Sequence, residues 1–221
     1  MLHKRLCGSF IESKEKKLQL DDVDSRTFIK TLDLWCGRHD GQEMELCAVQ
    51  QLAIVADLFQ ITEVVYSLEE AVMGQLSVEA CGEVLLWSGR CGMQRLEADA
   101  LKMAAERFEE FARTAGFMRM GDEAPSSVLD DDRLVARSEE AVWEAVVGWK
   151  EGKECQVGWR GLVGKIRFPL MGEKYLTNRV VGMVGRKDGE WMAGVVAEAL
   201  RAKAARRKCA MLELELPSMS R

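Results

Sequence analysis

The stretch from Ser127 to Met171 constrains the fold most, because a helix start, an apolar stripe and a stop signal follow one another there in order. Ser138 stands where a helix N-cap belongs, and Glu139 and Glu140 follow in the first turn, where carboxylates favour the positive end of the helix dipole. Apolar side chains then recur at helical spacing, namely Val142, Trp143, Val146, Val147 and Trp149. The pattern predicts a helix with one buried face.

A second apolar stripe begins after a short Gly-Lys-Glu link. It consists of Trp159, Leu162, Val163 and Ile166. Pro169 predicts a break just after Phe168, because the residue before a proline disfavours helix and proline cannot donate a hydrogen bond. The two stripes therefore predict an antiparallel helical hairpin with Trp143, Val147 and Trp159 in its core.

These residues also carry a family resemblance. An acidic triplet at 130–132, the Ser-Glu-Glu helix start at Ser138, Trp149 one helix later and an Arg-Phe-Pro-Leu-Met stop at 167–171 occur in a specific order. The order resembles the BACK domain, the helical module that follows a BTB (POZ) domain in many ubiquitin-ligase substrate adaptors, kelch-repeat proteins among them. The resemblance implies that the helix pair expected within 78–115 opens this domain.

Composition predicts an all-α protein of one large or two small domains. The chain has 221 residues, 48% of them hydrophobic, and only 3 prolines against 30% charged residues, so that long stretches suit amphipathic helices around a core. We expect helical hairpins preceded by a helical segment with at most one short strand, at Leu18 to Leu20. No internal repeat of 20 to 50 residues is visible, and so no kelch repeats.

The remaining helices are predicted from caps and apolar spacing. We expect helices from Ser25 to Gly37, from about Glu43 to Phe59, and from Thr62, and a last one from Glu190. The segment 116–127, which contains Pro125, is predicted as a loop, and the glycine-rich segment after Met171 as irregular.

The front of the chain resembles the C-terminal half of a BTB domain. The sequences LQLDDVDSRTF, LAIVADLFQI and LEEAVMGQL follow the order in which that family runs from its last strand through its final helices. The family's dimerising helix and most of its sheet would precede Met1, so the homodimer is not carried over, and we expect Leu32, Trp35 and Leu52 to present apolar surface. The domains are then 1–76 (partial BTB-like), 77–176 (BACK-like) and 177–221 (a helix with a basic run and a tail).

The resemblance also implies a binding motif. Phe10, Ile11 and Glu12 match the hydrophobic, any, glutamate motif that BTB adaptors present to a cullin scaffold protein. An apolar anchor in a pocket with a carboxylate fixing its orientation suits a central contact. The alternative is an apolar residue followed by a solvated glutamate, and the placement of the motif before LQLDDVDSRTF favours the binding interpretation.

The residues contain no set that would suit catalysis or a cofactor. The seven cysteines include no Cys-x-x-Cys pair, and two histidines are too few for a zinc site. Cys36 and His39 could form a thiol and base pair, but a half-buried thiol beside a solvated histidine is the preferred interpretation. The glycines of 158–165 lack the spacing of a phosphate loop, and 130–132 lacks the pattern of a calcium loop, so we expect the triplet to cap the next helix.

Charge and hydropathy limit the partners. A net charge of -5 argues against general affinity for nucleic acid, and no apolar run approaches the roughly 18 to 20 residues that cross a membrane. The basic run from Arg201 to Lys208 lacks interleaved aromatic residues, so a solvated helix end is preferred to a nucleic-acid site. Free thiols and the absence of a signal sequence predict a reducing compartment, cytoplasmic or nuclear.

The sequence therefore predicts a protein that binds other proteins and is not an enzyme. By resemblance, it would be a BTB-BACK adaptor that docks a cullin and holds an unknown protein substrate for ubiquitin transfer. One alternative is a degenerate BTB-BACK module that oligomerises or scaffolds without a ligase role. A second alternative is a nucleic-acid binder that uses the basic run.

Overall fold

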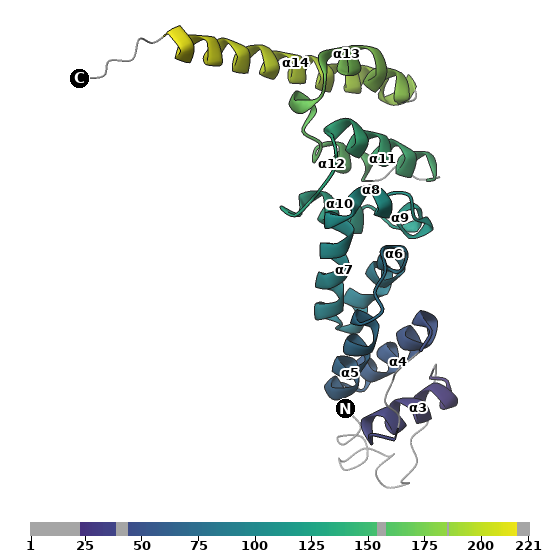
Figure 1. Ribbon diagram of the computed structural model, residues 1–221. Helices are drawn as coiled ribbons and strands as arrows, with labels where there is room; N and C mark the ends of the chain where they lie inside the picture. The colour runs from purple at the N-terminus through teal and green to yellow at the C-terminus, as the bar shows by residue number, and fades with distance from the viewer. Residues whose placement is uncertain (1–22, 39–43, 154–157, 185, 216–221) are drawn as a thin grey trace, which may run out of the picture. The chain divides into compact units, whose positions relative to one another are not determined.

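A computed structural model of the chain describes residues 23–38, 44–153, 158–184 and 186–215, with side chains of the last helix described as far as Cys209 (Figure 1). Within these ranges the backbone forms helices and turns and no strand, which confirms the predicted all-α class. The predicted strand at Leu18 to Leu20, the motif Phe10, Ile11, Glu12, and His39 lie outside the described residues.

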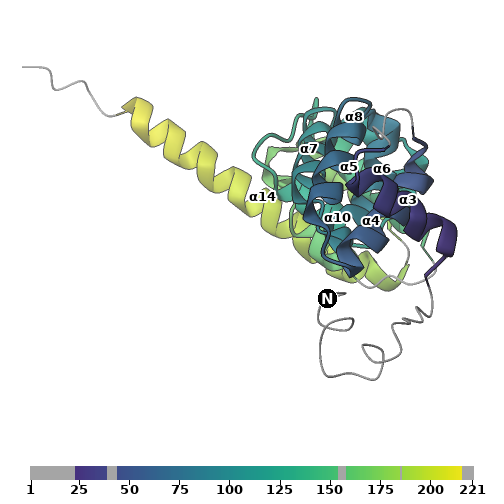
Figure 2. The ribbon, with the colours of Figure 1, turned by 90° about the horizontal axis from the view of Figure 1, so that it is seen from below.

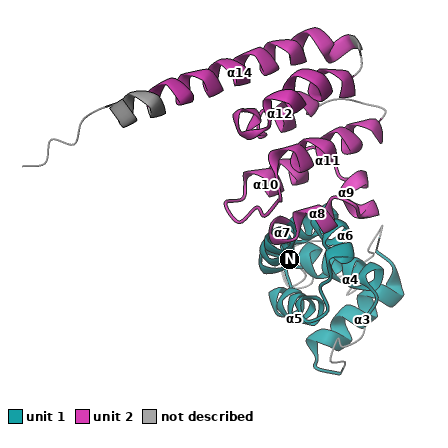
Figure 3. Cartoon of the chain, turned by 45° about the horizontal axis from the view of Figure 1, so that its top comes forward, with its two compact units in different colours: residues 1–104 teal, residues 105–221 magenta. Residues whose placement is uncertain are grey.

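The chain divides into two compact units, residues 1–104 and 105–221 (Figure 3). The boundary falls inside one helix, α7 (Gln94–Glu106). Each unit therefore has its own core, and the two are described separately.

Unit 1 is built around α4, which packs against both α3 and α5. Its elements are α3 (Ser25–Trp35), α4 (Leu46–Leu58), α5 (Thr62–Met73), α6 (Val78–Trp87), the 3-10 helix η1 (Ser88–Cys91) and the first part of α7. Side chains at or near zero exposure fill its core, among them Ala53, Leu68, Cys81, Met93 and Leu96. The rings of Phe28 and Phe59 meet edge to face, with their centroids 5.1 Å apart, and seat α3 on this core.

Two details of unit 1 differ from the prediction. The N-cap of α3 is Asp24 and not Ser25, because the Asp24 carboxylate accepts the hydrogen bond from the Thr27 N–H at 2.8 Å. Leu52 was expected at the surface but is only 2% exposed, because α4 lies between two helices. Trp35 is 55% exposed, which confirms that an apolar surface is present on α3.

Unit 2 contains two helices where the sequence predicted a loop. Thr114 caps α9 (Ala115–Arg119) by accepting from the Phe117 N–H, and α10 (Glu123–Asp130) follows. Pro125 lies in the first turn of α10. Backbone N–H groups in a first turn have no intrahelical acceptor, so the missing N–H of proline costs no hydrogen bond there. The loop prediction for 116–127 was therefore wrong, because proline at the start of a helix does not break it.

The predicted hairpin forms the core of unit 2. Its helices are α11 (Glu139–Glu151) and α12 (Trp159–Val163), and Ser138 caps α11 by accepting from the Ala141 N–H at 3.3 Å. The Trp143 ring packs 5.7 Å from that of Trp159 and 5.4 Å from that of Phe168. The second helix is shorter than predicted and ends at Gly164, since its glycines weaken it, although Ile166 in the following turn stays buried.

The acidic triplet does not cap the next helix. Asp131 instead accepts hydrogen bonds from the backbone N–H and the guanidinium of Arg133, and these hold the pKa of the Asp131 carboxyl at about 2. Asp130 pairs with Lys165 at 2.6 Å. The triplet thus fixes a turn that follows α10, while Ser138 caps α11.

The rest of unit 2 is helical, including the segment after Met171 that was predicted as irregular. Its elements are α8 (Phe108–Phe111), the 3-10 helix η2 (Phe168–Leu170), α13 (Glu173–Tyr175), the π-helix η3 (Leu176–Val180), the 3-10 helix η4 (Val181–Met183) and α14 (Arg186–Glu215). Within residues 173–183 the chain changes from α to π to 3-10 geometry, so the segment is helical but not regular, and irregularity was the prediction.

The last helix, α14, begins four residues before the predicted Glu190 and buries Met192, Val196 and Ala199. Two residues of its basic run make contacts inside unit 2: Lys203 donates to two backbone carbonyls and Arg207 pairs with Glu173. The predicted solvated helix end therefore holds for Arg207, whose side chain is 68% exposed, but was wrong for Lys203, which is half-buried. None of the helices in the described ranges is both long enough and apolar enough to cross a membrane.

Replacing the central tryptophan of unit 2 tests its core. We expect Trp143→Ala to lower the free energy of unfolding by about 3 to 5 kcal/mol, because the ring is fully buried and leaves a cavity. The matched control is Trp35→Ala, in which the side chain lost is 55% exposed, and we expect a change below about 1 kcal/mol. Urea unfolding followed by circular dichroism measures both, and equal losses would contradict the assigned core.

Candidate protein-interaction surface

Exposed apolar side chains concentrate on unit 1. Eight large hydrophobic residues are exposed within the described ranges, and two of them, Val135 and Leu170, lie in unit 2. The other six lie between residues 29 and 86: Ile29, Trp35, Ile54, Leu58, Tyr66 and Leu86. Apolar side chains that gather on one surface, rather than being scattered singly, mark sites where another protein binds.

Three of these residues line one groove. Ile54 and Leu58, one turn apart on α4, are 50% and 47% exposed, and Leu86 on α6 is 38% exposed. They border a hollow of about 380 Å³, which we call the α4–α6 groove. Its lining residues are Gln50, Ile54, Asp57, Leu58, Leu86, Trp87, Arg90 and Cys91. Apolar side chains make up most of the lining, together with the amide Gln50, the acidic Asp57 and the basic Arg90.

The η1 turn supplies two of the residues that line the groove, Arg90 and Cys91. Gly92 ends η1 with φ +69°, a left-handed conformation that glycine adopts without strain. A Cβ at that position would lie 3.2 Å from Asp57 Oδ1, so a side chain there would press on α4. Cys91 is 3% exposed, and burial, followed by the nearby Asp57 carboxylate, raises the pKa of its thiol. This cysteine is therefore part of the packing and is not a reactive thiolate.

A glutamate on α5 fixes the helix that follows η1. Glu69 is 1% exposed, and its Oε1 accepts hydrogen bonds from the backbone N–H groups of Arg95 at 2.9 Å and Leu96 at 3.3 Å. These N–H groups belong to the first turn of α7, which lacks intrahelical acceptors for them. The carboxylate thus caps α7 from another helix, and its charge favours the positive end of the α7 dipole.

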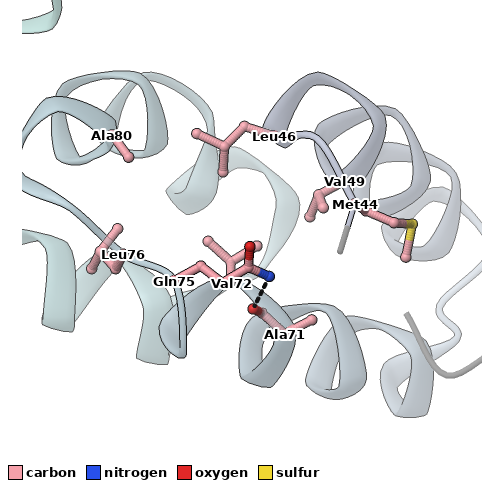
Figure 4. A pocket seen from close by; sticks show the side chains of 8 residues that line it. All are labelled: Met44, Leu46, Val49, Ala71, Val72, Gln75, Leu76 and Ala80. Carbon is pink, nitrogen blue, oxygen red and sulfur yellow. Dashed lines mark hydrogen bonds between the residues drawn. The ribbon is translucent and has the colours of Figure 1, made fainter. Parts of the chain in front are cut away.

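A second, smaller hollow lies between the start of α4, the end of α5 and the start of α6 (Figure 4). Its volume is about 100 Å³, and the Gln75 side chain donates from Nε2 to the Ala71 carbonyl at 3.2 Å, while the other labelled side chains are apolar. A hollow of this size suits one aliphatic side chain. The α4–α6 groove is the larger of the two and exposes more apolar surface, so it is the better candidate for binding a protein segment.

The described residues offer no comparable site for chemistry. Within them no group of three His, Cys, Asp or Glu side chains could hold a metal ion. The cysteines that the structure describes are all free thiols, and Cys36 is exposed on the surface of unit 1. Residues 158–165, whose glycines imitate a phosphate loop, form α12 and the turn after it.

The sequence interpretation did not find the groove. It predicted α4 but assigned only one apolar face, whereas Ile54 and Leu58 lie outside that face and are exposed. The available signal was the sequence of α4, LCAVQQLAIVADL, which is apolar on more than one side. Phe10, Ile11 and Glu12, the predicted binding motif, lie outside the described residues, so their contact with a partner stays a prediction.

Comparison with known proteins supports the resemblance drawn from the sequence. Residues 81–181 match the family model "BACK: BTB And C-terminal Kelch". The chain is 28% identical to kelch-like protein 3 of Mus musculus over 197 residues, 88% of this chain and 33% of that protein. It is 26% identical to human kelch-like protein 2, over 80% of this chain and 30% of that protein, and 29% identical to human kelch-like protein 41, over 76% and 28%.

These matches confirm the similarity to BTB-BACK proteins and place the BACK segment where the helix pair and the hairpin were predicted. The chain spans about a third of the length of the kelch-like relatives that it matches. What those whole proteins do is therefore carried to this chain only as a proposal.

Removing the cap on α7 tests how the groove is positioned. We expect Glu69→Ala to destabilise unit 1 by about 1 to 3 kcal/mol, because a buried and a part-buried N–H group lose their acceptor. Glu69→Gln keeps an acceptor oxygen and should lose less. The adjacent Glu70 side chain is 71% exposed and only 3.9 Å from Arg95, so Glu70→Ala should cost below about 1 kcal/mol. Thermal unfolding ranks the three variants, and an equal loss for Glu69→Ala and Glu70→Ala would contradict the cap.

Proposed function

We propose that this chain, in which residues 81–181 match the BACK domain, is an adaptor of BTB-BACK type that docks a cullin scaffold protein. The observation that carries the proposal is the α4–α6 groove, where three large apolar side chains are exposed side by side in unit 1. The groove opens next to α6, whose residues from Cys81 onward belong to the matched segment. The adaptor would work in a reducing compartment, cytoplasmic or nuclear, and would also hold a protein substrate.

The groove has the properties of a binding site for an apolar segment. Covering Ile54, Leu58 and Leu86 removes apolar surface from water, which is the main favourable contribution to protein association. Asp57 and Arg90 bring opposite charges to the same groove, so a partner with complementary charges can bind in only one orientation. The firm cap on α7 and the tight η1 turn keep the walls in place before binding, which lowers the entropy cost of association.

The motif Phe10, Ile11, Glu12 is the second part of the proposal. An aromatic anchor would enter a pocket of the cullin and the carboxylate would fix its orientation. The groove and the motif are separate contacts, so each can be tested by itself.

A second candidate function is a scaffold without a ligase role. It is favoured by Ile29 and Trp35 on α3, which are 57% and 55% exposed and do not line the α4–α6 groove. Such residues suit self-association or another partner.

Binding to an isolated cullin N-terminal domain tests the proposal. We expect Leu58→Asp and Leu86→Asp to weaken binding at least about tenfold, because a carboxylate would have to be buried in the contact. The matched control is Val135→Asp, a substitution of an apolar residue that is 61% exposed in unit 2, and it should bind like the wild type. Isothermal titration calorimetry measures all three, and thermal melts check that each variant is folded.

The outcomes separate the two candidates. If the wild type and Val135→Asp bind the cullin domain but Leu58→Asp and Leu86→Asp do not, the groove is a contact site. If Glu12→Ala also weakens binding, the motif at residues 10–12 is a contact site as well. A folded wild-type chain that does not bind the cullin domain would contradict the adaptor proposal. Self-association of that chain, abolished by Trp35→Ala, would then favour the scaffold.

A further inference from the structure

The helix α14 lies over the segment from η2 to η4 but is held there by few apolar side chains. It packs against η2, the π-helix η3 and η4 (Figure 1). Met192, Val196 and Ala199 are 0%, 6% and 3% exposed, and they all lie in the first half of the helix. From Ala204 to Cys209 every residue is exposed, and in Figures 1 and 2 this part extends beyond the rest of unit 2.

The first turn of α14 is fixed by a buried ion pair. Lys150 Nζ lies 2.6 Å from Asp188 Oδ2, and the two side chains are 7% and 10% exposed. The same ammonium lies 4.3 Å from the centre of the Trp159 ring, and Arg160 approaches Asp188 at 3.7 Å. Separating Asp188 from Lys150 would leave a buried charge without its partner, which is strongly unfavourable.

Beyond Ala199 the contacts of α14 are of a different kind. Lys203, which is half-buried, donates from Nζ to the carbonyl oxygens of Pro169 at 3.0 Å and Met171 at 2.7 Å. Arg207 pairs with Glu173 at 2.8 Å, but both side chains face water, at 68% and 44% exposed, and such a pair contributes little to stability. Lys203 is therefore the principal contact that holds the middle of α14 against the turn.

The turn under Lys203 carries apolar residues. Phe168 and Met171 are 4% and 0% exposed, while Leu170 between them is 55% exposed. The turn is also held from the other side, since Glu139 accepts from the Arg167 N–H and Glu140 from the Gly172 N–H. It would therefore keep its shape if α14 moved away.

We infer that the part of α14 from Leu200 to Cys209 is a releasable strap, that Lys203 is its latch and that the Lys150–Asp188 pair is its fixed end. Release of Lys203 lets this part separate from the 168–171 turn while the first half of the helix stays in place. The strap lies against the 168–171 turn in unit 2. It is therefore a feature separate from the α4–α6 groove of unit 1.

Hydrogen exchange of the full chain, read by mass spectrometry, tests the strap. Lys203→Met keeps the aliphatic part of the side chain and removes the donor. We expect amide exchange about tenfold to a hundredfold faster in 200–209 and in 168–172, the range that follows from losing a hydrogen bond to a charged group. Exchange in 188–196 should be unchanged. Lys203→Arg keeps donors for both carbonyls and should exchange like the wild type, as should the control Lys208→Met, which removes an exposed lysine from the same helix.

Three results would overturn the inference. Unchanged exchange in Lys203→Met would show that the lysine is no latch. Equal acceleration along all of α14, residues 188–196 included, would show that the helix separates as one piece. Loss of the cooperative melt of unit 2 in Lys203→Met would show that the contact is part of the core. Arg207→Met, which removes the exposed outer pair, provides a milder variant, and we expect faster exchange confined to the residues near 207.

Discussion

Carboxylates that accept hydrogen bonds from distant backbone N–H groups hold this protein together. A chain of short helices has many helix ends, and each end leaves backbone groups without intrahelical partners. Glu69 supplies an acceptor for the first turn of α7, while Glu139 and Glu140, in the first turn of α11, bind the N–H groups of Arg167 and Gly172. These contacts link residues 26 to 32 positions apart, so they fix the connections between helices as well as the helices themselves.

The same constraint explains how a groove with exposed apolar walls can persist in unit 1. Side chains such as Ile54, Leu58 and Leu86 would lower their exposure if the helices could shift together. The Glu69 cap opposes that shift, because the movement would leave the N–H groups of Arg95 and Leu96 without their acceptor. A rigid frame therefore keeps available an apolar surface that a looser bundle would bury.

Local signals in the sequence predicted the parts of the fold that local chemistry decides. Ser138, the apolar spacing around Trp143 and the break at Pro169 suffice for the hairpin, because caps and helical periodicity act over a few residues. Pro125 misled the prediction because proline is a breaker within a helix but is tolerated in its first turn. The groove and the Glu69 cap depend on which faces α4 and α5 leave uncovered, and that is decided by packing between helices.

Dependence on carboxylates makes one joint of unit 2 sensitive to acid. Burial raises the pKa of Glu140, but hydrogen bonds, first among them that from the Gly172 N–H, outweigh burial and leave the pKa below its ordinary value. The Glu140 carboxylate thus contributes its full stability above the pKa of a glutamate in the unfolded chain. This contribution is lost as the pH falls through the lower pKa that Glu140 has in the folded protein. The 167–172 turn would then lose a hydrogen bond to α11, while the packing of the uncharged Trp143 ring against Trp159 and Phe168 does not depend on Glu140. Acid would loosen this connection between α11 and the turn without acting on the rings that pack beside it.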